Sequence, residues 1–315
     1  MPTESYNLTR RQLMLAGAGS ILSAGALGST AAAAGSTPRP TLCLFSKHLQ
    51  HLGHAALATT LRELGFPGVD LTVRPGGHVL PENVERDLPK AVAALEKENI
   101  AVPMITTGIT SASHSTARPT LYTAAKHGIP FFKVGYYRYS DAKPFDETLA
   151  KAKREAEGLA KLAAGAKIQG GLHNHNGNYV GAAMWDNWWV LRDIDPQAMG
   201  AYFDPCHATV EGGGKGWEIG FHRLAGRIKM VAIKDFYWEK TGGAWKVQMC
   251  PLGEGMVNFP RFFKLLAASG FRGPISLHME YPIDGPTESA REERTLAAIG
   301  RDLAYLKQQV AAAFG

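Results

Sequence analysis

Eight short β-rich runs alternate with longer amphipathic stretches along this sequence, and this alternation restricts the fold more than any other feature. The runs occupy residues 41–47, 68–74, 101–107, 131–137, 170–175, 201–204, 229–235 and 274–280. Apolar residues recur at helical spacing over residues 54–64, 88–98, 146–163, 185–193, 217–224 and 259–268. Parallel strands need crossover connections, which are usually helices, so the pattern predicts a parallel sheet.

Eight strand–helix units close most simply into one (β/α)₈ barrel, the TIM barrel. The rival is an open doubly wound sheet, which normally carries a glycine-rich phosphate turn after its first strand. Residues 46–49, Ser-Lys-His-Leu, are not such a turn. The chain has 315 residues, and a barrel of this kind needs about 250. The sequence therefore predicts an α/β protein with a single eight-stranded parallel barrel over residues 35–315.

Residues 1–34 differ in character from the rest of the chain. Arg10 and Arg11 precede an apolar run, rich in Gly and Ala, that ends in four alanines at residues 31–34. This order is typical of an export signal, and the paired arginines indicate the twin-arginine route. The run has few large apolar residues and would be a poor permanent membrane span. We expect a cleaved signal peptide and a periplasmic or secreted mature protein without a membrane anchor.

Charge and cysteine content exclude other classes of protein. The formal net charge is +6, but the basic residues are scattered, with no Lys/Arg run that would indicate a nucleic-acid partner. Cys43, Cys206 and Cys250 form no CxxC metal motif and no disulfide framework. Either three free thiols or one disulfide fits an exported protein, and the sequence does not indicate the oligomeric state.

Polar and aromatic residues stand at or just beyond the ends of the predicted strands, where barrel enzymes place their chemistry. From the first, second, fourth and seventh strands these include Lys47, Arg74, His78, Tyr136 and Trp238. Their cationic and hydrogen-bonding groups suit sugar hydroxyls, and the aromatic rings suit the apolar faces of a pyranose. We expect these five side chains to bind substrate.

The last four strands end in imidazoles, carboxylates and one ammonium. These residues are His173, His175, Asp204, His207, Lys234, His278 and Glu280. The side-chain period of two in a strand puts His173 with His175, and His278 with Glu280, on a shared face. Each residue alone is more often a core, capping or surface residue, but four consecutive strand ends with the same character predict one shared cavity. Such a cluster is costly to bury unless it binds a metal, a substrate or its own members.

Several segments of this half of the chain resemble the xylose-isomerase-like superfamily of sugar isomerases and epimerases, which also contains the AP endonuclease family 2 branch. They lie at residues 173–176, 204–207, 211–213, 233–238 and 251–255. The segments at 45–50 and 70–78 are similar to secreted proteins loosely described as sugar phosphate isomerases/epimerases. The resemblance covers essentially the whole mature chain and implies a barrel enzyme.

The resemblance also implies one divalent metal ion, held in typical members by Glu, Asp, His and Glu on strands five to eight. Asp204 and Glu280 match that pattern, whereas His173 replaces the first Glu and Ala232 replaces the His. We expect His173, Asp204 and Glu280 to hold Mn²⁺, Zn²⁺ or Mg²⁺. The alternative is a site that has lost the metal, with Lys234 supplying the positive charge. Further nitrogen ligands are available from His175, His207 and His278.

Family chemistry begins with removal of a proton next to the carbonyl of a sugar or keto-sugar. The resemblance makes Glu280 the expected base, with Lys234 or His207 stabilising the oxyanion or returning the proton. Because the strand-five Glu is itself a base in two-base epimerases, His173 argues against plain C3 epimerisation and leaves isomerisation, other epimerisations, elimination and hydration open. His175 and His278 are expected to bind the carbohydrate. The alternative is a non-catalytic periplasmic sugar-binding barrel; an endonuclease would need more metal ligands.

Overall fold

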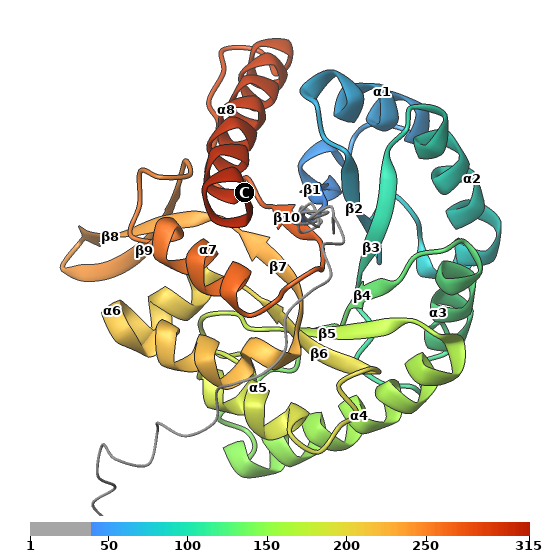
Figure 1. Cartoon of the computed structure of the whole chain (residues 1–315), viewed down its shortest axis with the longest axis vertical. Helices are drawn as coiled ribbons and strands as arrows, with labels where there is room; N and C mark the ends of the chain where they lie inside the picture. The colour runs from blue at the N-terminus through green and yellow to red at the C-terminus, as the bar shows by residue number, and fades with distance from the viewer. Residues whose placement is uncertain (1–38) are drawn as a thin grey trace, which may run out of the picture. The chain divides into compact units, whose positions relative to one another are not determined.

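The computed structural model describes residues 39–315; the predicted signal peptide, residues 1–34, lies outside the described residues. Eight parallel strands close into a barrel in the order β1-β10-β7-β6-β5-β4-β3-β2 (Figure 1). They are β1 (Leu42–Phe45), β2 (Gly68–Val73), β3 (Ala101–Thr107), β4 (Phe131–Lys133), β5 (Gln169–His173), β6 (Met199–Phe203), β7 (Ile228–Ile233) and β10 (Ile275–Leu277). Each lies within or overlaps a predicted run, and the predicted TIM barrel is confirmed.

The helices of the described chain surround this barrel (Figure 1). They are α1 (His54–Leu64), α2 (Val84–Lys97), α3 (Ala117–Lys126), α4 (Phe145–Ala166), α5 (Met184–Leu191), α6 (Pro205–Leu224), α7 (Phe259–Ala268) and α8 (Glu288–Phe314), with short 3₁₀ turns η1 (Ser46–Leu49), η2 (Pro81–Asn83) and η3 (Ala225–Arg227). The predicted bounds of α1 and α7 are confirmed. Helices α3 and α8 were not predicted, and α6 begins twelve residues before the predicted start at residue 217.

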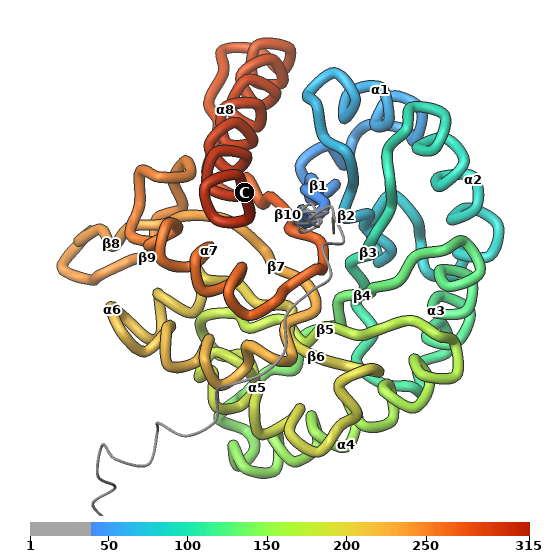
Figure 2. Tube along the Cα trace, viewed as in Figure 1, coloured from blue at the N-terminus to red at the C-terminus, as the bar shows by residue number. Residues whose placement is uncertain are grey.

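One feature interrupts the regular alternation of strands and helices. Strands β8 (Asp235–Thr241) and β9 (Ala244–Cys250) form an antiparallel hairpin that projects from the ring directly after β7 (Figure 2). Gly242 and Gly243 form its two-residue turn with φ of 60° and 83°, which glycine adopts without the strain that a side chain would introduce. The segment that follows Lys234 therefore leaves the barrel instead of lining it.

The barrel interior is packed separately from the layer between strands and helices. Met104, Tyr202, Met230 and Ala232 form the inner cluster. Gly171 makes room for it, because a Cβ there would lie 2.0 Å from Cε of Met230. Ala232, where the resemblance led us to expect a metal-binding histidine, thus serves apolar packing.

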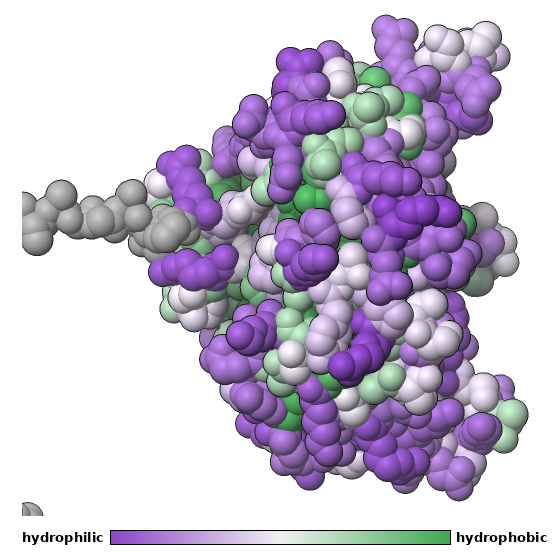
Figure 3. All heavy atoms as spheres, turned by 90° about the vertical axis from the view of Figure 1, so that its right-hand side faces the viewer, coloured by the Kyte–Doolittle hydropathy of each residue, from purple (hydrophilic) through white to green (hydrophobic). Residues whose placement is uncertain are grey.

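The described cysteines Cys43, Cys206 and Cys250 are all buried and free, so the structure answers the thiol question that the sequence leaves open. No helix in residues 39–315 is long and apolar enough to cross a bilayer. On the side of the barrel formed by α2 and α3 the surface is largely hydrophilic, with hydrophobic residues in small patches (Figure 3).

Candidate active site

A cavity of about 130 Å³ lies at the carboxyl ends of the barrel strands. Eight of the side chains singled out in the sequence line it: Lys47, Arg74, Tyr136, His173, His175, Lys234, His278 and Glu280. Most of these residues are the last of a strand or come just after it, as the strand-end pattern predicts. The sequence thus locates the cavity, and the contacts of each side chain decide its chemistry.

Asp204 lies next to the cavity, fully buried, and its position is set by the start of α6. It is the N-cap residue of that helix, and its Oδ1 accepts a hydrogen bond of 3.0 Å from the backbone N–H of His207. The side-chain amide of Asn174 binds both the backbone N–H and the carbonyl of Asp204, each at 2.8 Å. The carboxylate is therefore held rigidly, with Oδ2 left for the site.

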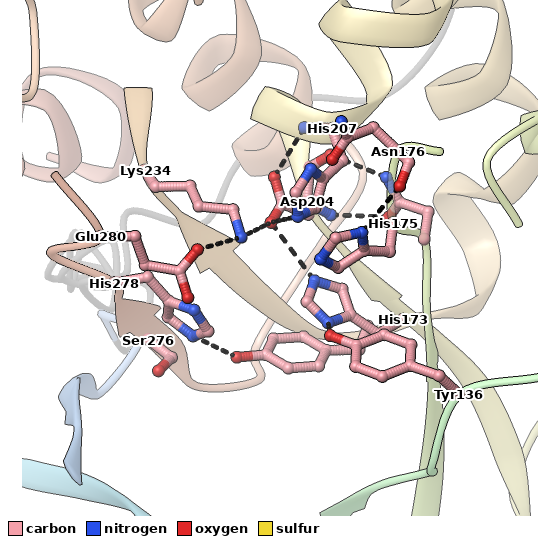
Figure 4. Close-up of polar contacts among 12 residues, drawn as sticks. Tyr136, His173, His175, Asn176, Asp204, His207, Lys234, Ser276, His278 and Glu280 are labelled. Atoms are coloured by element: carbon pink, nitrogen blue, oxygen red, sulfur yellow. Dashed lines mark hydrogen bonds and ion pairs between the residues drawn. The ribbon is translucent and has the colours of Figure 1, made fainter. Parts of the chain in front are cut away.

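Oδ2 of Asp204 faces three nitrogen atoms (Figure 4). Nε2 of His173 is 3.3 Å away, Nζ of Lys234 is 3.3 Å away and Nε2 of His207 is 3.6 Å away. Burial alone would raise the pKa of Asp204, but the ammonium of Lys234 and the hydrogen bond with His173 outweigh it and hold that pKa well below its usual range. Asp204 is the anionic centre of the site.

His173 is fixed from both sides of its ring. Its Nδ1 forms a 2.9 Å hydrogen bond with the hydroxyl of Tyr136, which directs Nε2 toward Asp204 (Figure 4). Burial lowers the pKa of His173 to about 4, so the ring is neutral near pH 7. A neutral imidazole is the form that binds metal ions.

His207 is a buried imidazole without hydrogen-bond partners. Neither ring nitrogen has a partner among the described residues, and burial holds its pKa well below the usual value for histidine. Buried polar atoms are rarely left unpaired, so such an atom requires a physical reason. The ring lies against His175, with ring centroids 3.9 Å apart.

A metal ion would supply that reason. Donor atoms of His173, Asp204 and His207 all lie within 4.8 Å of one another, and all three residues are buried. Two imidazoles and a carboxylate are a common ligand set for a divalent ion with an open position. The residues present therefore fit the group that the sequence implied: His173 and Asp204 are two of the three predicted ligands, His207 completes the cluster, and Glu280 lies outside it.

Glu280 is instead paired with lysines. Its Oε2 accepts a 3.0 Å hydrogen bond from Lys234, and its Oε1 is 3.6 Å from Nζ of Lys47. Burial opposes ionisation of Glu280, but Lys234 and His278 lower its pKa below the usual value. In Lys234, burial is likewise outweighed, by Asp204 and Glu280, and the pKa is raised. Glu280, Lys234 and Asp204 thus form a carboxylate–ammonium–carboxylate bridge whose lysine and aspartate are buried and whose glutamate is half-buried.

A second network lies deeper in the barrel. The Tyr202 hydroxyl donates to Oδ2 of Asp70 at 3.2 Å and contacts Nε2 of His278 at 3.0 Å. Asp70 also accepts from Thr106 at 2.7 Å and Ser276 at 2.9 Å. Burial, only partly offset by these bonds, raises the pKa of Asp70 to about 6. This network orients His278 from below.

Two predicted substrate-binding residues do not line the cavity. His78 is held by the β1 and β2 loops: its Nδ1 bonds Thr72 at 3.1 Å and Gln50 at 3.2 Å, and its Nε2 bonds the Leu49 carbonyl at 3.2 Å. Trp238 lies on the hairpin, where it is 37% exposed. The structure does not bring these two side chains to the cavity, because one loop turns inward on itself and the other chain segment leaves the barrel; substrate binding by them stays a prediction.

Lys133, Thr106, Phe45 and Tyr202 line the cavity without having been assigned a role from sequence. Lys133 ends β4 and Thr106 lies next to the end of β3, so both belong to the strand-end pattern of the sequence, which gave neither of them a role. Tyr202 lies inside a strand, and only the inward direction of its side chain brings it to the site. Phe45 stacks on His278, with ring centroids 4.3 Å apart and planes at 20°.

Fold and site together define a (β/α)₈ barrel with a buried, charged cavity at the carboxyl ends of its strands. The family described as Xylose isomerase-like TIM barrel matches residues 58–299, and the chain belongs to this family. No curated protein matches the chain in sequence.

Solved structures of low sequence identity share the fold. D-psicose 3-epimerase from Clostridium cellulolyticum H10, with D-tagatose, is 11% identical, has a TM-score of 0.64, and the match covers 86% of this chain and 99% of that one. The 3-keto-D-glucoside 4-epimerase from E. coli is 14% identical, with a TM-score of 0.63 and coverage of 86% and 100%. A barrel protein from Mycobacterium smegmatis in complex with magnesium is 17% identical, with a TM-score of 0.63 and coverage of 84% and 92%.

Proposed function

We propose that this protein is an enzyme that acts on a sugar or keto-sugar by removing a proton next to a carbonyl. The observation that carries the proposal is the bridge of Glu280, Lys234 and Asp204 beside a polar cavity at the catalytic end of the barrel. The sugar epimerases among its structural neighbours support the substrate class. Isomerisation, epimerisation, elimination and hydration all remain open as the overall reaction. Which product forms depends on the atom to which the proton is returned.

Glu280 is the proposed base. Lys234 keeps it ionised at neutral pH, and its side chain lines the cavity. When Glu280 accepts a proton, the ammonium of Lys234 stays paired with Asp204 at 3.3 Å, so the lysine is not left as an uncompensated buried charge. An ammonium has three N–H donors; Lys234 donates one to Glu280 and forms an ion pair with Asp204, so a donor is available to a developing oxyanion.

We infer that His173, Asp204 and His207 hold one divalent ion. The unpaired, neutral imidazole of His207 supports this inference most directly. Imidazole ligands suit Zn²⁺ or Mn²⁺ better than Mg²⁺, which prefers oxygen. An ion bound there would act as a Lewis acid toward a substrate carbonyl. In this arrangement His207 is a ligand rather than the group that returns the proton.

The remaining cavity residues position the carbohydrate in this proposal. Tyr136, His175 and His278 present a hydroxyl, an imidazole edge and a ring stacked on Phe45, and Lys47 stands at the more exposed end beside Glu280. We also propose that residues 1–34 direct export by the twin-arginine route, so that the substrate is met in the periplasm or outside the cell.

A non-catalytic sugar-binding barrel is the second candidate. Ala232 in the inner apolar cluster favours it, because no strand-seven histidine is present. Incubation of the protein in D₂O with sugars and 3-keto-sugars separates the two, since a binder exchanges no substrate C–H. An enzyme with Glu280 as base should exchange, and Glu280→Gln should slow exchange about 10²–10⁴-fold.

A surface carboxylate provides the matched control. Glu63, on α1, is 65% exposed in its side chain and pairs only with Arg62, so Glu63→Gln should exchange at the wild-type rate. Exchange that is unchanged in Glu280→Gln would assign the base elsewhere. No exchange with any sugar or keto-sugar, despite measurable binding, would support the binding barrel instead.

A further inference from the structure

We propose that the cavity takes an anionic carbohydrate, a sugar acid, and that Arg74 and Lys133 bind its carboxylate. The inference rests on the proposed function, since it names the substrate class of the same site. It starts from an uneven distribution of charge around the cavity. On one side Lys234 and Lys47 are neutralised by Asp204 and Glu280; on the other side two cations have no carboxylate partner in the described part of the chain.

Strand register places these two cations on neighbouring walls. Thr106 of β3 pairs with Lys133 of β4 on one side and with Thr72 of β2 on the other. Arg74 follows β2 two residues after Thr72, and both cations line the cavity. The two positive groups therefore face the same space, from either side of β3.

Each cation is held by an aromatic ring instead of an acid. Nζ of Lys133 lies 3.3 Å from the ring centroid of Tyr136, and the guanidinium of Arg74 lies 5.4 Å from that of Phe45. No acidic side chain in residues 39–315 forms an ion pair with either one. A ring face stabilises a cation without using its N–H donors, so the donors of both groups remain free for a ligand.

The nearest buried acid is already occupied. Asp70 accepts hydrogen bonds from Thr106, Ser276 and Tyr202, and it forms no ion pair with Lys133. Burial first, and Arg74 next, lower the pKa of Lys133 to about 7. Lys133 is buried and Arg74 half-buried, and an incoming anion would relieve the repulsion between these two positive groups, neither of which forms an ion pair within residues 39–315.

A carboxylate fits these groups best. Guanidinium and ammonium donors form their strongest hydrogen bonds with carboxylate or phosphate oxygens. The cavity measures about 130 Å³, and a planar carboxylate takes less of that space than a phosphate group. With the anion held at Arg74 and Lys133, the rest of the sugar would extend toward Lys234 and Glu280 on the opposite wall.

Calorimetric binding to the purified protein tests the proposal with three probes: D-glucuronate, D-glucose and D-glucose 6-phosphate. We expect D-glucuronate to bind at least about 10-fold more tightly than D-glucose. Arg74→Met and Lys133→Met should each weaken D-glucuronate binding about 10–100-fold and leave D-glucose nearly unchanged. Lys133→Arg keeps the charge and should restore most of the affinity.

Arg118→Met is the matched control, because Arg118 also lies over an aromatic ring, 4.4 Å from the centroid of Tyr122, but outside the cavity. It should bind all probes as the wild type does, and thermal melts should show that every variant is folded. The proposal is overturned if D-glucose binds as tightly as D-glucuronate, if neither Met variant loses affinity, or if no anionic probe binds at millimolar concentration.

Tighter binding of D-glucose 6-phosphate would overturn the carboxylate in favour of a phosphate. Deuterium exchange with a neutral keto-sugar is decided separately, so the proposed function can stand while the anion proposal fails.

Discussion

Replacement of Lys234 by Met removes a buried cation that bridges the buried carboxylate of Asp204 and the half-buried carboxylate of Glu280, and its effect can be estimated from the distances. At 3.3 Å from Asp204 and 3.0 Å from Glu280, each pair is worth about 5 kcal/mol at an effective dielectric of about 20. Burial of the lysine cancels part of this gain. Truncation of one partner of a buried pair costs about 3–5 kcal/mol, because charge is left uncompensated.

We therefore expect Lys234→Met to lower the free energy of unfolding by about 3–5 kcal/mol, measured in urea with a chelator present. Lys47→Met is the control: Lys47 is half exposed and 3.6 Å from Glu280, and an exposed pair contributes about 1 kcal/mol or less. Zn²⁺ or Mn²⁺ should restore part of the loss in the Lys234 variant. The ammonium no longer competes for Asp204, so the variant should bind the ion more tightly.

The difference in free energy of unfolding between the wild type and Lys234→Met should also depend on pH, which gives a second measurement. In the wild type the pKa of Glu280 is lowered below 4.5, so the stability it contributes is present at neutral pH and is lost as the pH falls through the folded-state pKa. In the variant, burial without Lys234 raises the pKa of Glu280, and protonation removes its uncompensated negative charge. The difference in free energy of unfolding between wild type and variant should therefore become smaller below about pH 5. A variant within about 1 kcal/mol of wild type at pH 7 would refute the reasoning.

Three further predictions concern other groups. Burial raises the pKa of Asp70 from 3.8 to about 6, so the folded state binds that proton more tightly than the unfolded chain does, and this carboxyl's contribution to stability should fall by about 2 kcal/mol as the pH rises from 4 to 6. Asp70→Asn should make the free energy of unfolding in urea less dependent on pH over that interval, and an unaltered pH dependence would disprove the prediction. His207→Ala should weaken Zn²⁺ or Mn²⁺ binding at least about 100-fold by calorimetry, whereas equal affinity would exclude it as a ligand. Replacing Arg10 and Arg11 by Lys should leave uncleaved precursor in the cytoplasm, and normal export of that variant would contradict the twin-arginine route.

The alternation of strands and helices was enough to predict the barrel, because a parallel strand requires a crossover at each step. The hairpin was not predicted, although Gly242-Gly243 between two alternating segments is a recognisable turn signal. The early start of α6 was missed because glycines 212, 213 and 214 weaken helical propensity. In the structure Gly213 interrupts the helix with φ of 57°, so the sequence signal and the kink have the same cause.

The strand-end pattern located most of the site, since strand direction alone brings those side chains to one edge. It predicted Glu280 as a metal ligand and His207 only as a further source of nitrogen. Two features that strand periodicity does not describe decide the contacts of these groups: Lys234 reaches both carboxylates and pairs with Glu280, and the first turn of α6 brings His207 near Asp204. Trp238 was expected at the cavity for a related reason: the direction of the preceding strand does not reveal that the chain leaves the sheet after Lys234.

Asp204 both caps helix α6 and supplies negative charge to the site, and a substitution to Ala removes both contributions at once. Oδ1 begins α6 by accepting the His207 N–H, while Oδ2 faces the site nitrogens. Loss of a cap alone costs about 1 kcal/mol, so an inactive Asp204→Ala protein would combine a frayed helix with an altered centre. Asp204→Asn keeps a capping oxygen and removes the charge. An uncharged residue at this position therefore always removes the negative charge, and one without a capping oxygen also removes the N-cap of α6. Position 204 should accordingly tolerate no stepwise replacement by uncharged residues.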